Sequence, residues 1–146
     1  MPRCFFACTL FALLISASAI AQKCTEQLIK EKDGNMPTPA ESKAPDVFFF
    51  SPMIDKPIVG SQEWKSVSEK DKSIAKNVKD EYSKVDRVVV TPSGDMAYSY
   101  GISHSTFDDE TGKHQDFTAA FLDVWRVVDG SCKLAARMVE PEGGKR

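Results

Sequence analysis

The residue whose setting most favours chemistry in this 146-residue chain is Asp123. It stands in the otherwise apolar stretch 121–125, FLDVW. If its side chain points into a dry pocket, desolvation raises its pKa, and the neutral carboxyl can act as a donor or general acid. A strand Asp more often pairs with a cation such as Arg126 or Arg137, or faces solvent, and we favour that interpretation. A catalytic Asp123 would require a second titratable group within hydrogen-bond reach.

The histidines are His104 and His114, on either side of the predicted loop 108–112. If this loop closes a hairpin, His104 falls near Asp116 and His114 near Thr106. Two imidazoles and a carboxylate can bind a metal ion, but the spacing matches none of the known ligand patterns. We therefore predict two surface histidines on strands, no metal site and no cofactor.

Residues 1–21 have the pattern of a secretory signal peptide. Arg3 gives a short positive lead, residues 4–15 form an almost unbroken apolar run, and Ala19-Ile20-Ala21 fits a small-x-small cleavage site. The alternative is a membrane anchor, but the apolar run is short for a spanning helix. We predict cleavage after Ala21, a secreted or periplasmic protein, and no membrane attachment after cleavage.

Cleavage would leave two cysteines, Cys24 and Cys132. In an oxidising compartment two thiols can pair. A bridge between them would close nearly the whole domain and contribute about 4 kcal/mol in the chain-entropy model. The alternative is two unrelated cysteines, one buried and one in a loose tail. Sequence does not show the Cα approach that a bridge needs, so both interpretations stay open.

The totals are those of one ordinary globular domain. The chain is 42% hydrophobic and 27% charged, and it is long enough to bury a core. Its net charge of −2 argues against a nucleic-acid surface, which normally needs a basic excess.

The stretch 123–137 is the strand, tight turn and strand on which the other elements pack. Asp129-Gly130 is the strongest short hairpin signal in the chain. Upstream, residues 61–79 have helical periodicity, because Trp64, Val67, Ile74 and Val78 share one face. Charges of both signs cover the remainder of that predicted helix.

Alternating or compact apolar runs predict the strands. They are 47–50, 58–59, 82–90, 95–107, 113–128 and 132–139. No helix separates the last four, so they should pair antiparallel in an α+β fold. We expect a short helix and an extended arm in residues 22–45, a domain over 46–140 and a disordered tail over 141–146.

Several of these motifs, in this order and spacing, resemble one superfamily. Thr91-Pro92-Ser93-Gly94-Asp95-Met96-Ala97-Tyr98, Gly101, Asp123-Val124-Trp125-Arg126 and Asp129-Gly130-Ser131-Cys132-Lys133-Leu134 resemble the SnoaL-like branch of the nuclear-transport-factor-2-like superfamily. The resemblance covers about residues 44–140. It implies a cone-shaped α+β fold, a curved antiparallel sheet packed on helices, with a pocket between them. Members are usually dimeric, so a homodimer is expected.

The ketosteroid-isomerase members of this superfamily use an Asp base, with an acid and a phenol as the oxyanion hole. The resemblance puts the base position at Ser51 and the acid at Asp123. A serine without a partner is too weak a base near neutral pH. The phenol comes from a long first helix, which residues 22–45 do not provide. Isomerase chemistry is therefore not predicted. The family often has Trp at position 132, so a Cys there makes sense if it is tied to Cys24.

The resemblance also suggests which side chains line the cone. These are the aromatic strand residues Phe48, Phe50, Tyr98, Tyr100, Phe121 and Trp125. Some of them could instead be plain core. We expect an exported domain that binds a small, largely apolar ligand, without requiring catalysis. One alternative is a lyase or isomerase-type enzyme that uses Asp123 as its acid. Another is a dimeric interaction module with a filled cone and an apolar patch on the outer face of the sheet.

Overall fold

The computed structural model describes residues 22–35, 38–52, 54–74 and 76–142. The predicted signal peptide over residues 1–21 lies outside this range, and so do residues 143–146 of the predicted tail. None of the described helices is long and apolar enough to cross a membrane.

The described elements form a mixed α+β domain, as predicted. In chain order they are α1 (Glu26–Gly34), η1 (Ala40–Ser42), β1 (Lys43–Phe50), β2 (Ile58–Val59), α2 (Ser61–Ile74), β3 (Lys76–Val90), β4 (Met96–Asp108), β5 (His114–Val128) and β6 (Ser131–Pro141). The strands make one sheet in the order β2-β1-β6-β5-β4-β3. β1 and β6 are parallel, and the other neighbouring strands are antiparallel.

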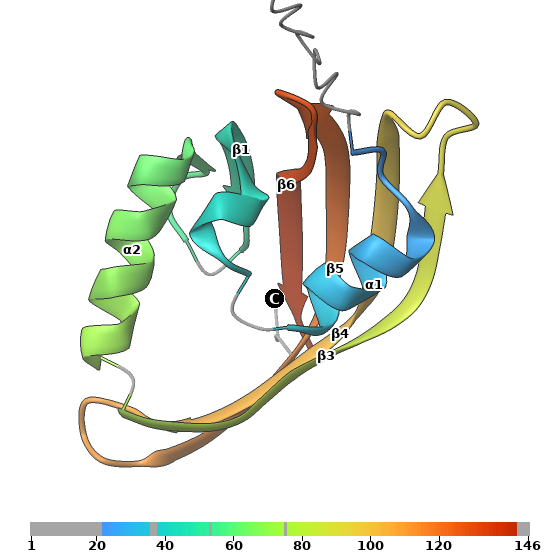
Figure 1. Ribbon diagram of the computed structural model, residues 1–146. Coiled ribbons are helices and arrows are strands. Elements are labelled where there is room, and N and C mark those ends of the chain that lie inside the picture. Colours follow the sequence, from blue (N-terminus) through green and yellow to red (C-terminus); the bar gives the residue numbers. More distant parts are fainter. Residues whose placement is uncertain (1–21, 36–37, 53, 75, 143–146) are drawn as a thin grey trace, which may run out of the picture.

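The sheet is strongly curved, and the helices lie on its concave side. Figure 1 shows α1 across this face, α2 beside β1, and the far ends of β3 to β5 bending beneath α2. We call the concave side the inner face; it carries the buried Ala97, Ser99 and Gly101 of β4. The opposite side, the outer face, carries Tyr98 and Tyr100.

The curvature of the sheet depends on the close approach of β3 to Gly101 of β4. The register of β3 against β4 shifts between Val85 and Arg87, which is the mark of a β-bulge. A Cβ at Gly101 would lie 2.0 Å from the carbonyl oxygen of Lys84. Only a residue without a side chain therefore allows β3 to pass at this distance.

A compact core lies between α1 and the sheet. Its buried members are Cys24, Ile29, Val47, Ala97, Trp125, Cys132 and Leu134. Cys24 and Cys132 form a disulfide, so the structure has the bridged arrangement that sequence left open. The bridge holds the start of α1 against the β5–β6 hairpin. The Thr25 hydroxyl caps this helix by accepting a hydrogen bond from the Leu28 N–H at 3.3 Å.

Several boundaries differ from the sequence prediction. β1 begins at Lys43, inside the predicted extended arm. The helix predicted over 61–79 ends at Ile74, and β3 begins at Lys76. Val78 therefore lies on a strand and is 45% exposed. Pairing with the long β4, beginning at Lys76 opposite Asp108, supplies backbone hydrogen bonds that outweigh the local helical pattern. At the other end, β6 continues to Pro141, where the sequence analysis placed the start of a tail.

Candidate functional site

A row of polar side chains crosses the inner face of the sheet. Ser99 of β4 is opposite Asp123 of β5, which is opposite Arg137 of β6. All three are buried. Asp33, in the last turn of α1, is also fully buried and lies over this row. The four residues, here called the inner polar cluster, bring two carboxyls and one guanidinium together.

Two of the hydrogen bonds in the inner polar cluster are short. Arg137 donates to both carboxylate oxygens of Asp123, from Nε at 2.8 Å and from Nη2 at 2.5 Å. The Ser99 hydroxyl donates to Asp33 Oδ2 at 2.5 Å and accepts from the Trp125 indole N–H at 3.2 Å. Arg137 Nη2 is 3.6 Å from Asp33 Oδ1. The guanidinium is thus paired principally with Asp123.

The second carboxyl is held in its neutral form. Burial, together with the neighbouring charge of Asp123, raises the pKa of Asp33 to about 8, against the opposing effects of Ser99 and Arg137. Asp33 Oδ1 accepts no hydrogen bond from any described residue. A proton on Asp33 removes this deficit, because it can be shared with Asp123. Near neutral pH the cluster therefore holds a neutral Asp33 and an Asp123–Arg137 ion pair.

A cavity of about 510 Å³ opens beyond the cluster, between η1, α2 and the inner faces of β3 to β6. Its apolar lining residues are Pro39, Ala40, Phe49, Trp64, Phe117, Phe121 and Val139. Its polar lining residues are Thr38, Lys43, Ser61, Lys65, Ser68, Glu69, Ser83, Ser103, His104, Ser105 and Arg137. Arg137 is the member of the inner polar cluster that lines this cavity. Among the described residues, Asp33 and Asp123 are not part of its wall.

Sequence predicted some of the cavity wall and misplaced the rest. Phe121 lines the cavity, whereas Trp125 is fully buried in the core. Four predicted lining residues are instead on the outer face, 36% to 43% exposed; they are Phe48, Phe50, Tyr98 and Tyr100. That part of the prediction is corrected. The inner face of β4 takes the smaller residues of the alternation because α1 and β3 approach it closely.

Asp33 was not foreseen as a site residue. Its position in the Asp-Gly-Asn sequence suggested only the end of a helix. The available signal was its spacing of four from Ile29, which places both side chains on one face of α1. Both are fully buried. A polar residue on the apolar face of a short helix needs a buried partner, and Ser99 is that partner.

The histidines belong to two different pairs. His104 lines the cavity, contacts Asp116 at 3.0 Å and stacks on Tyr82 with ring centroids 5.2 Å apart. The predicted approach of His104 to Asp116 is thus confirmed. His114 is opposite Asp108, not Thr106, and its Nδ1 is 3.2 Å from Asp108 Oδ1.

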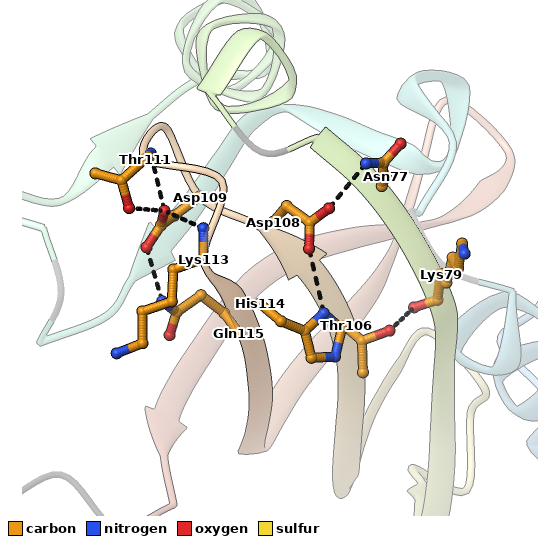
Figure 2. A network of polar contacts seen from close by, with 9 residues as sticks. All are labelled: Asn77, Lys79, Thr106, Asp108, Asp109, Thr111, Lys113, His114 and Gln115. Carbon is orange, nitrogen blue, oxygen red and sulfur yellow. Dashed lines mark hydrogen bonds and ion pairs between the residues drawn. The ribbon is translucent and has the colours of Figure 1, made fainter.

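The end of the β4–β5 hairpin carries polar contacts that also reach Asn77 and Lys79 of β3 (Figure 2). Asp109 accepts hydrogen bonds from the Thr111 hydroxyl at 2.7 Å, the Lys113 N–H at 3.1 Å and the Gln115 amide at 2.7 Å. The Thr111 bond, followed by that of Lys113, lowers the pKa of Asp109 to about 2. No group of three metal-binding side chains occurs among the residues in the described ranges. We interpret this network as a cap on the hairpin.

Comparison with known proteins gives the fold. No protein-family model matches the sequence, and no curated protein matches it significantly. A putative calcium/calmodulin-dependent protein kinase II association domain from Xanthomonas campestris has a TM-score of 0.59 at 19% identity, over 73% of each chain. A conserved protein from Planctomyces limnophilus has a TM-score of 0.59 at 18% identity, over 79% of this chain and 88% of the other.

A third similar structure carries the fold's name. It is a nuclear-transport-factor-2-like protein with a cystatin-like fold from Novosphingobium aromaticivorans, with a TM-score of 0.56 at 14% identity, over 73% of this chain and 68% of the other. The chain therefore has the nuclear-transport-factor-2-like fold that the resemblance in sequence implied. Likeness at such low identity establishes the architecture, and function has to be argued from the site.

Proposed function

We propose that this domain binds a small molecule with a largely apolar body in the 510 Å³ cavity. The observation that carries the proposal is the composition of the wall. Aromatic rings come from β1, α2 and β5, and Phe49 and Trp64 meet with centroids 4.8 Å apart. Serine and threonine hydroxyl groups also line the cavity. A cavity of this size that combines aromatic and aliphatic surface with polar groups is typical of small-molecule sites, although here the polar lining residues outnumber the apolar ones.

Catalysis by Asp123 is less well supported. A second titratable group, Asp33, does lie beside it, as an enzyme would require. However, Arg137 occupies both oxygens of Asp123, and neither carboxyl is among the described residues that line the cavity. Ser51, at the position of the isomerase base, is buried and is not among them either. We propose that the two acids hold Arg137 in place at the base of a binding site.

Filling the cavity tests the proposal. Ser68 lines it from α2, whereas Ser66 of the same helix is exposed and is not a lining residue. Ser68→Trp is expected to weaken binding of 1-tetralone, a small ring compound, by at least about tenfold, or 1.4 kcal/mol. Ser66→Trp, the matched control, should bind like the parent protein. Chemical shifts of the cavity residues on titration provide the measurement. Equal binding by both variants would contradict the proposed site.

We further propose that a second copy of the chain covers the outer face. Two rows of apolar side chains cross four neighbouring strands there. They are Phe50, Met138, Leu122 and Tyr100, and then Phe48, Ala136, Val124 and Tyr98. Monomeric proteins rarely expose apolar patches that extend this far.

Charge in the middle of these rows should dissociate the dimer. Leu122→Lys is expected to raise the dimer dissociation constant at least about tenfold, because it buries an unpaired ammonium. Sedimentation velocity over a concentration series measures this. Val78→Lys is the control, since Val78 is exposed near the start of β3 and is not part of the two rows. A parent protein that stays monomeric at every concentration would refute the dimer and leave the cavity proposal standing.

A further inference from the structure

Two buried hydroxyls in the cavity wall make no hydrogen bond to any described residue. They are the Thr38 Oγ1 and the Ser83 Oγ. Both residues line the cavity, and only 5% of the surface of Thr38 is exposed. Buried polar groups in folded proteins nearly always have a partner, so each exception calls for an explanation. The remaining buried atom of this kind, Asp33 Oδ1, is accounted for by the proton of Asp33.

The two hydroxyls belong to different walls. Thr38 precedes η1 on the helical side, where its carbonyl oxygen accepts a hydrogen bond from the Lys43 ammonium. This bond engages the backbone of Thr38 and not its hydroxyl, which stays without a partner. Ser83 lies on β3, opposite Ser103 of β4. The Ser103 hydroxyl donates instead to the Ala119 carbonyl oxygen at 3.3 Å, so it does not satisfy Ser83.

A hydroxyl without a partner lowers the stability of the apo fold, because its hydration is lost on burial and not replaced. An apolar ligand would leave both groups unpaired. A ligand with an acceptor oxygen would pair them, since each O–H can donate to a carbonyl, ether or hydroxyl oxygen. The discrimination is strongest where a site is built to bond an oxygen and the competing molecule lacks it.

We propose that Thr38 and Ser83 determine specificity, and that the ligand is a largely apolar molecule carrying acceptor oxygens. This rests on the proposed function, because it names the ligand class of the same cavity. The charge of Arg137 is balanced by Asp123, so the ligand can be neutral. Thr38 and Ser83 act by hydrogen bonding alone, and the proposal includes no covalent step.

Two probes that differ only in one oxygen test the idea: tetralin and 1-tetralone. The parent protein is expected to bind 1-tetralone about five- to tenfold more tightly than tetralin, the effect of one neutral hydrogen bond. In Thr38→Val combined with Ser83→Ala, the two affinities should become equal through loss of 1-tetralone binding, with tetralin unchanged. The single variants show which hydroxyl contacts the carbonyl, and Thr38→Ser should retain the preference.

Stability gives a readout that needs no ligand. Thr38→Val keeps the shape of the side chain and removes a hydroxyl without a partner, so the melting temperature should stay the same or rise. A fall in melting temperature would assign the hydroxyl to the fold and overturn the proposal. Equal binding of the two probes by the parent protein would overturn it as well, while leaving the cavity as a binding site. Absence of binding by either probe would overturn the proposed function together with this inference.

Discussion

Loss of the Cys24–Cys132 disulfide is expected to lower the free energy of unfolding by about 4–5 kcal/mol. The two residues are separated by 108 positions, so the bridge closes most of the domain. In the chain-entropy model a loop of this length gives one of the larger effects that a single disulfide can have. The sulfurs are also part of the core, because both cysteines are 1% exposed and pack in the cluster with Trp125 and Leu134.

Urea unfolding followed by tryptophan fluorescence measures this effect, with and without a reductant that opens the bridge. The double variant Cys24→Ala with Cys132→Ala is the control, because its unfolding curve should not respond to the reductant. The reduced parent protein should resemble it. An unfolding midpoint of the parent that is unchanged by complete reduction would contradict the prediction.

The bridge also bears on the site. The residues around Cys24 are fixed by backbone hydrogen bonds from Gln22 N–H to the Gly130 carbonyl at 2.6 Å and from Cys24 N–H to the Gly94 carbonyl at 2.8 Å. α1 therefore begins at a fixed point on the hairpins. Asp33, the last residue but one of α1, then meets Ser99. We expect the reduced protein to lose the order of the inner polar cluster before it loses the sheet.

The sheet could be predicted because its signals are local. Asp129-Gly130 requires positive φ at both positions, and the structure has 49° and 73° there. The alternation along residues 96–102 likewise predicts β4. The prediction of a helix over 61–79 failed at its C-terminal end, because strand pairing with the distant β4 outweighed the local helical pattern. Residues 76–79 continue a helical charge pattern in sequence, but β4 is long enough to pair with Lys76 and Lys79.

Which face of a strand points inward could not be predicted from alternation alone. In β4 one face carries Tyr98 and Tyr100 and the other carries Ala97 and Ser99. The resemblance suggested that the aromatic side chains line the cone, and for Tyr98 and Tyr100 that prediction was wrong. The inner face must accommodate α1 and the bulge of β3, so it takes small residues, and the aromatic side chains remain outside. Asp33 was missed for a related reason, because its partner Ser99 is 66 residues away.

Raising the pH from about 5 to about 8 is expected to lower the free energy of unfolding by roughly 3–4 kcal/mol, through Asp33 alone. Its pKa is about 8 in the folded protein and has the ordinary value of 3.8 when the chain is unfolded. Between these values the folded state keeps a proton that the unfolded state releases. The contribution to stability is therefore complete below about pH 3.8, falls by up to 1.4 kcal/mol per pH unit, and is lost above about pH 8.

Asp33→Asn isolates this effect from every other titrating group. The amide is neutral at all pH values and can still accept the hydrogen bond from the Ser99 hydroxyl, so the variant should lack the decline and be more stable than the parent protein at about pH 9.

Asp123→Asn should act differently. It removes the charge that repels ionisation of Asp33, and Arg137, 3.6 Å away, then favours an ionised Asp33. The variant should lose stability overall, and its decline should shift to lower pH. Urea unfolding of the parent protein and the two variants between about pH 5 and about pH 9 measures these differences in stability. Parallel pH profiles for the parent protein and Asp33→Asn would show that Asp33 does not hold the proton.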